Sequence, residues 1–179
     1  GRPAGGTLGR HGIPVKRKKV CMLGAFAVGK TSLVSRYVHS MFSERYQTTV
    51  GVKVDKKVVE AAGESVTLVL WDLFGEDDYQ ELKPTFLRGS AGFLLVADGT
   101  RPSTLETALG LRERAIQAAG DIPMLLLLNK ADRADEWEID LDAVRDRAAG
   151  LPVLRTSAKT GAGVEDAFLA LVQAMLAPR

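Results

Sequence analysis

The stretch from Gly24 to Thr31 has the residue types and the spacing of a phosphate-binding loop. It reads Gly-Ala-Phe-Ala-Val-Gly-Lys-Thr, fits the pattern G-x-x-x-x-G-K-[ST], and lies between an apolar run and a helical pattern. Successive backbone N–H groups in such a loop surround a phosphate, and the positive end of the following helix dipole faces the same anion. Lys30 would reach the β- and γ-phosphates, and Thr31 would place its hydroxyl on magnesium. The pattern therefore predicts a nucleoside triphosphate, without naming the base or the reaction.

Three further polar motifs each follow an expected strand. Asp72-Leu73-Phe74-Gly75 is a D-x-x-G motif, whose Asp can hold magnesium through water and whose Gly can present its N–H to a γ-phosphate. Asn129-Lys130-Ala131-Asp132 is an N-K-x-D motif, in which the carboxylate can accept two parallel hydrogen bonds from guanine but not from adenine. Thr156-Ser157-Ala158-Lys159 could present a backbone N–H to the guanine O6. Because ligands bind at the carboxyl ends of strands in open α/β sheets, these motifs predict a guanine-nucleotide site.

From about Lys18 to Leu176 the chain resembles the Ras superfamily of small GTPases, most closely its Rab- and Rho-like branch. Besides the four motifs, residues 70–79 look like the second switch of that branch, and residues 49–52 look like the first switch running into a strand. The resemblance implies a GTP- and GDP-binding switch that needs Mg²⁺ and hydrolyses GTP slowly. It also implies effector, exchange-factor and GTPase-activating proteins that bind the two switch loops.

The resemblance assigns roles to individual residues. It implies phosphate contacts by Gly24, Ala25, Phe26, Ala27, Val28, Gly29, Lys30, Thr31 and Ser32. It implies base contacts by Asn129, Lys130 and Asp132, with Ser157, Ala158 and Lys159 behind them. Phe42 would pack against the base or ribose, although simple anchoring of its loop explains it equally well, and Tyr46 would close over the phosphates.

The metal and the reacting phosphate have their own implied residues. Thr31 and Thr49 would be magnesium ligands, with Asp72 acting through water. Thr48 is the alternative to Thr49, which we prefer because it directly precedes a Val-Gly step. The residues implied to act on the γ-phosphate are Lys30, Thr49, Gly75 and Glu76.

Three departures from the family pattern bear on hydrolysis and anchoring. Glu76 stands where the family has a water-orienting Gln, and a carboxylate can accept a hydrogen bond but cannot donate one. Phe26 occupies a position where the family usually has a small residue, so we expect slow hydrolysis. Arg45 could serve as an arginine finger within the chain; the alternative is an ordinary solvated Arg. The end of the sequence carries no Cys for a prenyl anchor.

Two other functions remain open at this point. The first is a nucleotide-binding interaction module with little or no hydrolysis, which Glu76 and Phe26 favour. The second is a P-loop kinase, which the N-K-x-D motif disfavours.

Composition limits the class of protein. A chain of 179 residues, with 46% hydrophobic residues and no apolar run of membrane-spanning length, suits one domain with a sizeable core. The formal net charge of +2 hides a basic start: residues 1–20 hold six basic and no acidic residues, so the remainder is mildly acidic. This balance argues against nucleic-acid binding. We expect a flexible leader over 1–14, a G domain over 15–179, and a cytoplasmic monomer that reaches membranes only through a partner or the basic stretch.

The hydrophobic periods predict an α/β protein of the P-loop NTPase class. We expect three layers, with a six-stranded, mostly parallel sheet, one antiparallel edge strand and about five helices. The expected strands are 15–23, 52–60, 65–71, 91–97, 124–128 and 151–156. The expected helices are 30–39, 79–88 apart from Pro84, 103–119, 141–149 and 164–176, and the segments 40–50 and 72–78 are expected to be long loops.

Overall fold

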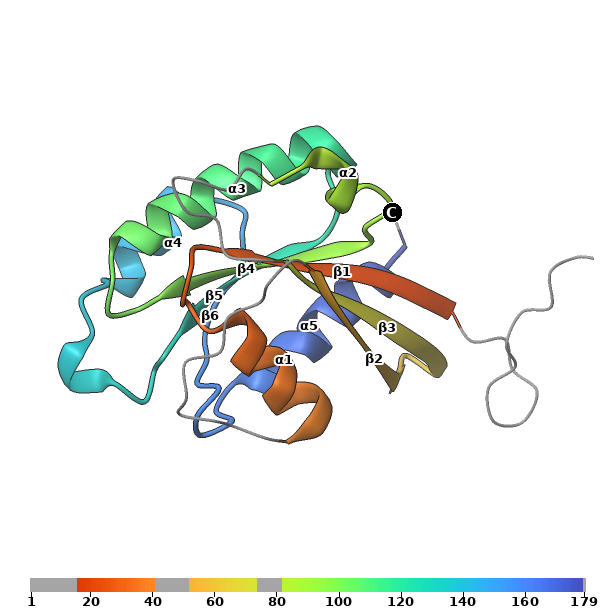
Figure 1. Ribbon diagram of the computed structural model, residues 1–179, viewed down its shortest axis with the longest axis horizontal. Coiled ribbons are helices and arrows are strands. Elements are labelled where there is room, and N and C mark those ends of the chain that lie inside the picture. Colours follow the sequence, from red (N-terminus) through yellow and green to blue (C-terminus); the bar gives the residue numbers. More distant parts are fainter. Residues whose placement is uncertain (1–15, 41–51, 74–81, 179) are drawn as a thin grey trace, which may run out of the picture.

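The computed structural model describes residues 16–40, 52–73 and 82–178, and within these it has one six-stranded sheet (Figure 1). The strands are β1 (Lys16–Gly24), β2 (Val52–Ala61), β3 (Glu64–Leu73), β4 (Gly92–Asp98), β5 (Met124–Asn129) and β6 (Val153–Arg155). Their spatial order is β2-β3-β1-β4-β5-β6, in which β2 pairs antiparallel with β3 and the other pairs are parallel. The predicted sheet is therefore confirmed, including its antiparallel edge strand.

Helices cover both faces of this sheet. They are α1 (Lys30–His39), α2 (Pro84–Leu87), α3 (Ser103–Ala119), α4 (Leu141–Arg147) and α5 (Val164–Leu176), with a short 3₁₀ turn, η2 (Ala134–Glu136). Figure 1 shows α1 and α5 on one side of the sheet and α3 on the other. No helix in the described part of the chain combines the length and the apolar character that crossing a bilayer requires.

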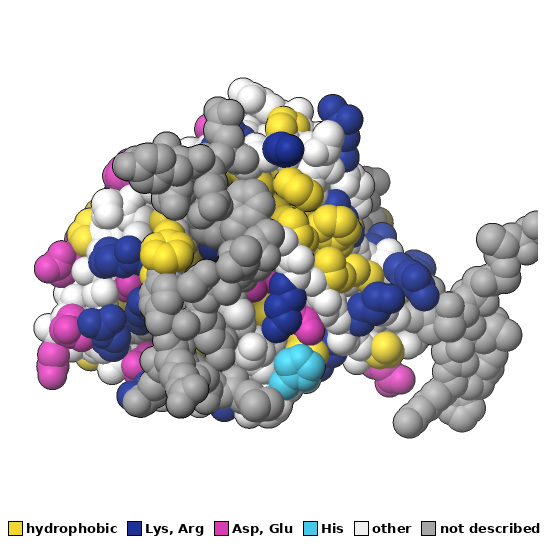
Figure 2. Space-filling view, in the orientation of Figure 1, with side chains coloured by type: hydrophobic (Ala, Val, Ile, Leu, Met, Phe, Trp, Pro, Cys, Tyr) yellow, Lys and Arg dark blue, Asp and Glu magenta, His cyan; other side chains and the backbone are white. Residues whose placement is uncertain are grey.

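The central strands are apolar along their whole length because both of their faces are buried. In β1, Val20 and Met22 join the core beneath α1 and α5, whereas the intervening Cys21 and Leu23 join the core beneath α3. Side chains alternate across a strand, so a strand between two helical layers needs apolar residues at every position. The basic start of β1 is exposed at Lys16 and Arg17, and Figure 2 shows Lys and Arg side chains gathered where that strand enters the sheet.

Several element boundaries differ from the sequence prediction, most clearly those of α2, β3 and β6. Within the described residues, the helix expected over 79–88 is only the four-residue α2, which starts at Pro84 because proline fits the first helical position but not an interior one. Asp72 lies inside β3, opposite Lys53 and beside Met22, rather than in the following loop. Strand β6 begins only after Pro152, whose carbonyl accepts from the N–H of Leu126.

Candidate functional site

The polar motifs meet at one edge of the sheet. Gly24 ends β1, Asp98 ends β4 and Asn129 ends β5, while Asp72 lies one residue before the end of β3. These strands are parallel, so their carboxyl ends lie together, next to the loop that joins β1 to α1 (Figure 1). The predicted convergence of the motifs is therefore present in the structure.

The phosphate-binding loop requires glycine at both of its ends. A Cβ at Gly24 would lie 2.5 Å from the carbonyl oxygen of Val96 on β4. Gly29 has φ +102°, in the left-handed region, and a Cβ there would collide with the side-chain amide of Asn129. Ala27 also has a positive φ, of 63°. The loop thus has backbone angles that most residue types adopt only with strain, and it lies next to the helix N-terminus where an anion would bind.

Lys30 is a buried cation directed at this loop. Only 6% of the residue is exposed, and Nζ donates to the carbonyl oxygens of Gly24, at 3.2 Å, and Ala25, at 3.4 Å. Burial lowers the pKa of Lys30 to about 8, against the opposing attraction of the Asp72 carboxylate. A bound phosphate would add negative charge beside this ammonium group and so offset part of the cost of burying it.

Thr31 and Asp72 form the oxygen pair expected of a magnesium site. The hydroxyl of Thr31 donates to Oδ2 of Asp72 at 2.6 Å, and Asp72 is only 1% exposed. The described ranges contain no cluster of three His, Cys, Asp or Glu side chains that could hold a metal alone. Magnesium bound to nucleotides usually takes one or two protein oxygens and completes its shell with phosphate and water. The pair therefore fits Mg²⁺ held jointly with a phosphate.

Asn129 joins the base side of the site to the phosphate loop. Its Nδ2 donates to the carbonyl of Val28 at 3.0 Å. Its Oδ1 accepts from the hydroxyl of Thr156 at 3.1 Å and from the N–H of Ala158 at 3.4 Å. Asn129 is 2% exposed, so it acts here as a structural link rather than as an open ligand group.

Asp132 is positioned to meet a ligand. It is exposed, and one of its carboxylate oxygens accepts from the hydroxyl of Ser157 at 2.7 Å. Ser157 Oγ in turn accepts from the N–H of Thr160 at 3.1 Å, which fixes the hydroxyl. The arrangement can hold the carboxylate in one orientation, as bidentate recognition of a guanine edge requires.

Two cationic side chains contact the phosphate loop and pair with the same carboxylate, that of Asp98. Lys130 Nζ donates to the carbonyl of Ala27 at 3.0 Å and pairs with Asp98 at 2.9 Å. Arg101 Nη2 donates to the carbonyl of Phe26 at 2.8 Å, and its Nε pairs with the same Asp98 oxygen at 3.0 Å. Asp98 is 1% exposed; burial alone would raise its pKa, but the hydrogen bonds from Lys130, Thr100 and Arg101 outweigh burial and hold it below its ordinary value.

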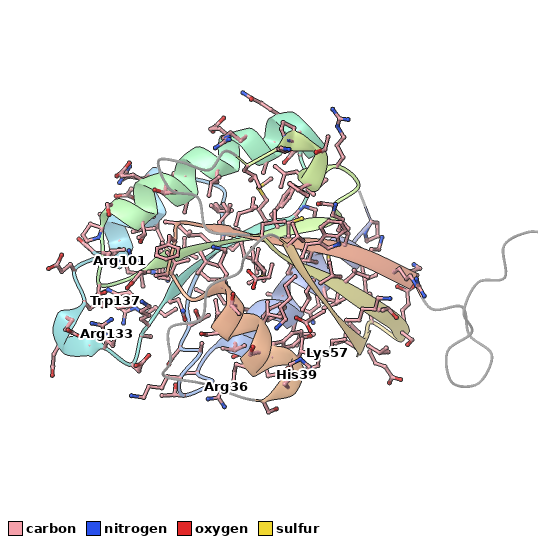
Figure 3. The ribbon with its side chains drawn as sticks, viewed as in Figure 1. Arg36, His39, Lys57, Arg101, Arg133 and Trp137 are labelled. Carbon is pink, nitrogen blue, oxygen red and sulfur yellow. The ribbon has the colours of Figure 1, made fainter. Side chains whose placement is uncertain are left out.

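Sequence reasoning missed Asp98, Arg101 and Arg36. Arg36, labelled in Figure 3, donates through Nε to the carbonyl of Ala158 at 2.8 Å and through Nη2 to that of Lys159, so α1 supports the base loop. Asp98 could have been found, because it ends an apolar strand as Asn129 does. The two Arg side chains bind backbone carbonyls, and no residue pattern in the sequence marks such a contact.

Several predicted site residues lie outside the described residues. These are Phe42, Tyr46, Thr48, Thr49, Gly75 and Glu76, together with Arg45. Their assigned roles remain predictions.

Comparison with known proteins agrees with this geometry. A family model described as "Ras family" matches residues 19–177. The "Ras-related protein Rab-4" of Dictyostelium discoideum is 35% identical over 161 residues, which cover 88% of this chain and 78% of that protein. The chain therefore belongs to the Ras family of small GTPases and is Rab-like.

Proposed function

We propose that this small GTPase binds GTP and GDP together with Mg²⁺, hydrolyses GTP slowly, and signals through two nucleotide-dependent switch loops. The observation that carries the proposal is the hydrogen bond of 2.6 Å between the Thr31 hydroxyl and Asp72, next to the buried ammonium of Lys30. Near the N-terminus of α1, the hydroxyl and the carboxylate can provide oxygen atoms for magnesium, and the ammonium group can provide positive charge for the phosphates.

The residues of this chain divide the work between binding and orientation. The loop N–H groups and Lys30 would bind the β- and γ-phosphates, and Asp132 would orient the base. Bound magnesium would neutralise charge that develops on the transferring phosphoryl group. Thr31 would hold this ion directly, and Asp72 would hold it through water.

The proposed switch depends on the γ-phosphate. Thr49 and Gly75 would contact that group and its magnesium only in the GTP form, so hydrolysis would release both loops. Effector, exchange-factor and GTPase-activating proteins would read this difference. Thr31→Asn should accordingly weaken GTP binding more than GDP binding, and equal losses in fluorescence titrations would argue against a two-state switch.

Slow hydrolysis is proposed from Glu76 and Phe26. Phe26 is 44% exposed on the phosphate loop, a large apolar side chain that can obstruct the approach of an activator's Arg. Glu76 carries a negative charge where a neutral amide orients water in the family. The same two residues favour a second candidate, a nucleotide-dependent interaction module with no useful hydrolysis.

Single-turnover phosphate release from preloaded GTP tests these proposals. We expect a rate constant on the order of 10⁻⁴ s⁻¹ for the parent and a rise of roughly tenfold in Glu76→Gln, with a smaller rise in Phe26→Gly. No detectable release would favour the interaction module. A parent that hydrolyses within seconds would contradict slow hydrolysis, and a loss of roughly 10³-fold in Arg45→Ala would identify an arginine finger within the chain.

The remaining proposals concern assembly and location. We propose that residues 15–179 act as a monomeric G domain, which size-exclusion chromatography with light scattering would test. We also propose that a partner, or the basic stretch at the start of β1, attaches the protein to membranes; a few charges there contribute roughly 1 kcal/mol each and are screened by salt.

A further inference from the structure

The carbonyl groups of the phosphate loop accept hydrogen bonds from the protein at six consecutive positions. Lys30 bonds those of Gly24 and Ala25, Arg101 bonds that of Phe26, Lys130 bonds that of Ala27, Asn129 bonds that of Val28, and the N–H of Leu33 bonds that of Gly29. With the carbonyls committed to the protein, the loop can direct its N–H groups at an anion. Of the five donor residues, four belong to the sequence motifs or to helix α1, and Arg101 belongs to neither.

Arg101 is held in place by the turn between β4 and α3. Its N–H donates to the carbonyl of Asp98 at 3.0 Å, and its own carbonyl accepts from the buried hydroxyl of Thr104 at 2.7 Å. Its guanidinium then bridges the Asp98 carboxylate and the Phe26 carbonyl. A planar guanidinium can make both contacts at once because its donors point in fixed, divergent directions.

The contact lies beside a strained part of the loop. The backbone of Ala27, with φ 63°, connects two held carbonyls: Arg101 bonds the carbonyl of Phe26, and Lys130 bonds that of Ala27. A non-glycine residue persists in this region only when its surroundings hold it there. Both cations depend on Asp98, so one carboxylate supports two neighbouring contacts to the loop.

We propose that Arg101 is a positioning residue that keeps the phosphate loop in its nucleotide-binding conformation and thereby slows nucleotide release. This inference rests on the proposed function. Arg101 would touch the loop from behind and not the nucleotide. Because the β-phosphate is common to GDP and GTP, losing Arg101 should weaken both nucleotides by the same factor.

The surroundings of Arg101 make a clean substitution possible. The side chain is 42% exposed and borders a cavity of about 540 Å³, which Ala27, Lys130 and Arg133 also line. Truncation there opens no void in either core. Arg133 offers a matched control: it lines the same cavity, is 43% exposed, and pairs instead with Glu136 at 2.6 Å. Figure 3 shows both Arg residues at the end of the molecule where β1 leads into α1.

The test measures release of a ribose-labelled fluorescent GDP, with magnesium present, from the parent and from Arg101→Ala, Arg101→Lys and Arg133→Ala. We expect release to be about tenfold faster in Arg101→Ala, partly restored in Arg101→Lys, and within about twofold of the parent in Arg133→Ala. The affinities for GDP and GTP should fall equally in Arg101→Ala. The melting temperature of nucleotide-free Arg101→Ala should match that of nucleotide-free Arg133→Ala.

Three results would overturn the inference. The first is release of labelled GDP from Arg101→Ala at the parent rate. The second is an equal acceleration of release in Arg133→Ala. The third is a melting temperature of Arg101→Ala that falls in proportion to the acceleration, which would indicate a general structural role. Failure of the proposed function itself would be distinct, because the parent would then not bind labelled GDP at all.

Discussion

The phosphate end and the base end of the site are held together over different sequence distances. At the phosphate end, the carbonyls of Phe26, Val28 and Ala27 bond side chains that lie 75, 101 and 103 positions away. At the base end, the side-chain oxygens of Asn129 and Asp132 accept hydrogen bonds from residues only 25 to 29 positions away, all in the segment that follows β6. The phosphate end is therefore a backbone site held by distant side chains. The base end is a side-chain site whose acceptor oxygens are held by the segment after β6, and Arg36 of α1 holds the backbone of that segment.

This difference predicts two kinds of mutant. Adding atoms to the phosphate loop should remove binding of every nucleotide, because the loop backbone has no room to move. Exchanging a functional group at the base end should change which nucleotide binds and leave the loop intact.

The largest expected effect is that of Gly29→Ala. The new Cβ would collide with the Asn129 amide, and alanine would be strained at φ +102°. Together these costs should weaken GDP by on the order of 10³-fold or more. Titration with labelled GDP measures the loss, and labelled xanthosine diphosphate should lose as much.

Gly63→Ala is the matched control for this substitution. Gly63 also has a positive φ, of 74°, but lies in the β2–β3 turn with no atom within 4 Å of its would-be Cβ. This variant should lose some stability and keep its GDP affinity. A Gly29→Ala protein that binds GDP as tightly as Gly63→Ala would contradict the packing of the loop against Asn129.

The next largest effect is that of Asp132→Asn. An amide cannot accept both guanine donors, so GDP should weaken by roughly 30- to 1,000-fold, while xanthine nucleotides, with a carbonyl in place of the 2-amino group, should bind better than in the parent. Competition between the two labelled diphosphates measures the exchange of preference. If Asp132→Asn loses both nucleotides equally, the carboxylate supports the structure rather than reading the base.

The smallest effect concerns Asn129, which links the two ends. Thr156 is fully buried and its hydroxyl donates to Asn129 Oδ1, so Thr156→Val removes that hydrogen bond with little change of shape. GDP affinity should fall by roughly three- to tenfold, without a change of base preference. Thr107→Val, at a half-buried position on α3 where the hydroxyl donates only to the carbonyl of Ser103, is the control and should leave affinity unchanged. An unaltered affinity in Thr156→Val would mean that Asn129 is positioned by its other bonds alone.

The sequence was informative where chemistry depends on side-chain type. The four motifs predicted Lys30, Thr31, Asp72 and Asp132 at one sheet edge, and the apolar runs predicted the order of strands and helices. Arg101 and Arg36 were missed because they bind backbone carbonyls, which every residue carries. The helix expected over 79–88 was wrong in its described part, because a proline at the first helical position fixes where that helix starts.

Competition against labelled GDP, with and without Mg²⁺, tests whether the protein has a magnesium-dependent site for guanine nucleotides. GDP and GTP should displace the label at concentrations roughly 10⁴-fold below those of ADP and ATP, because adenine leaves the Asp132 carboxylate unpaired. Removing magnesium should weaken GTP more than GDP. ADP that competes as well as GDP, or GTP affinity that does not depend on magnesium, would contradict a magnesium-dependent guanine-nucleotide site.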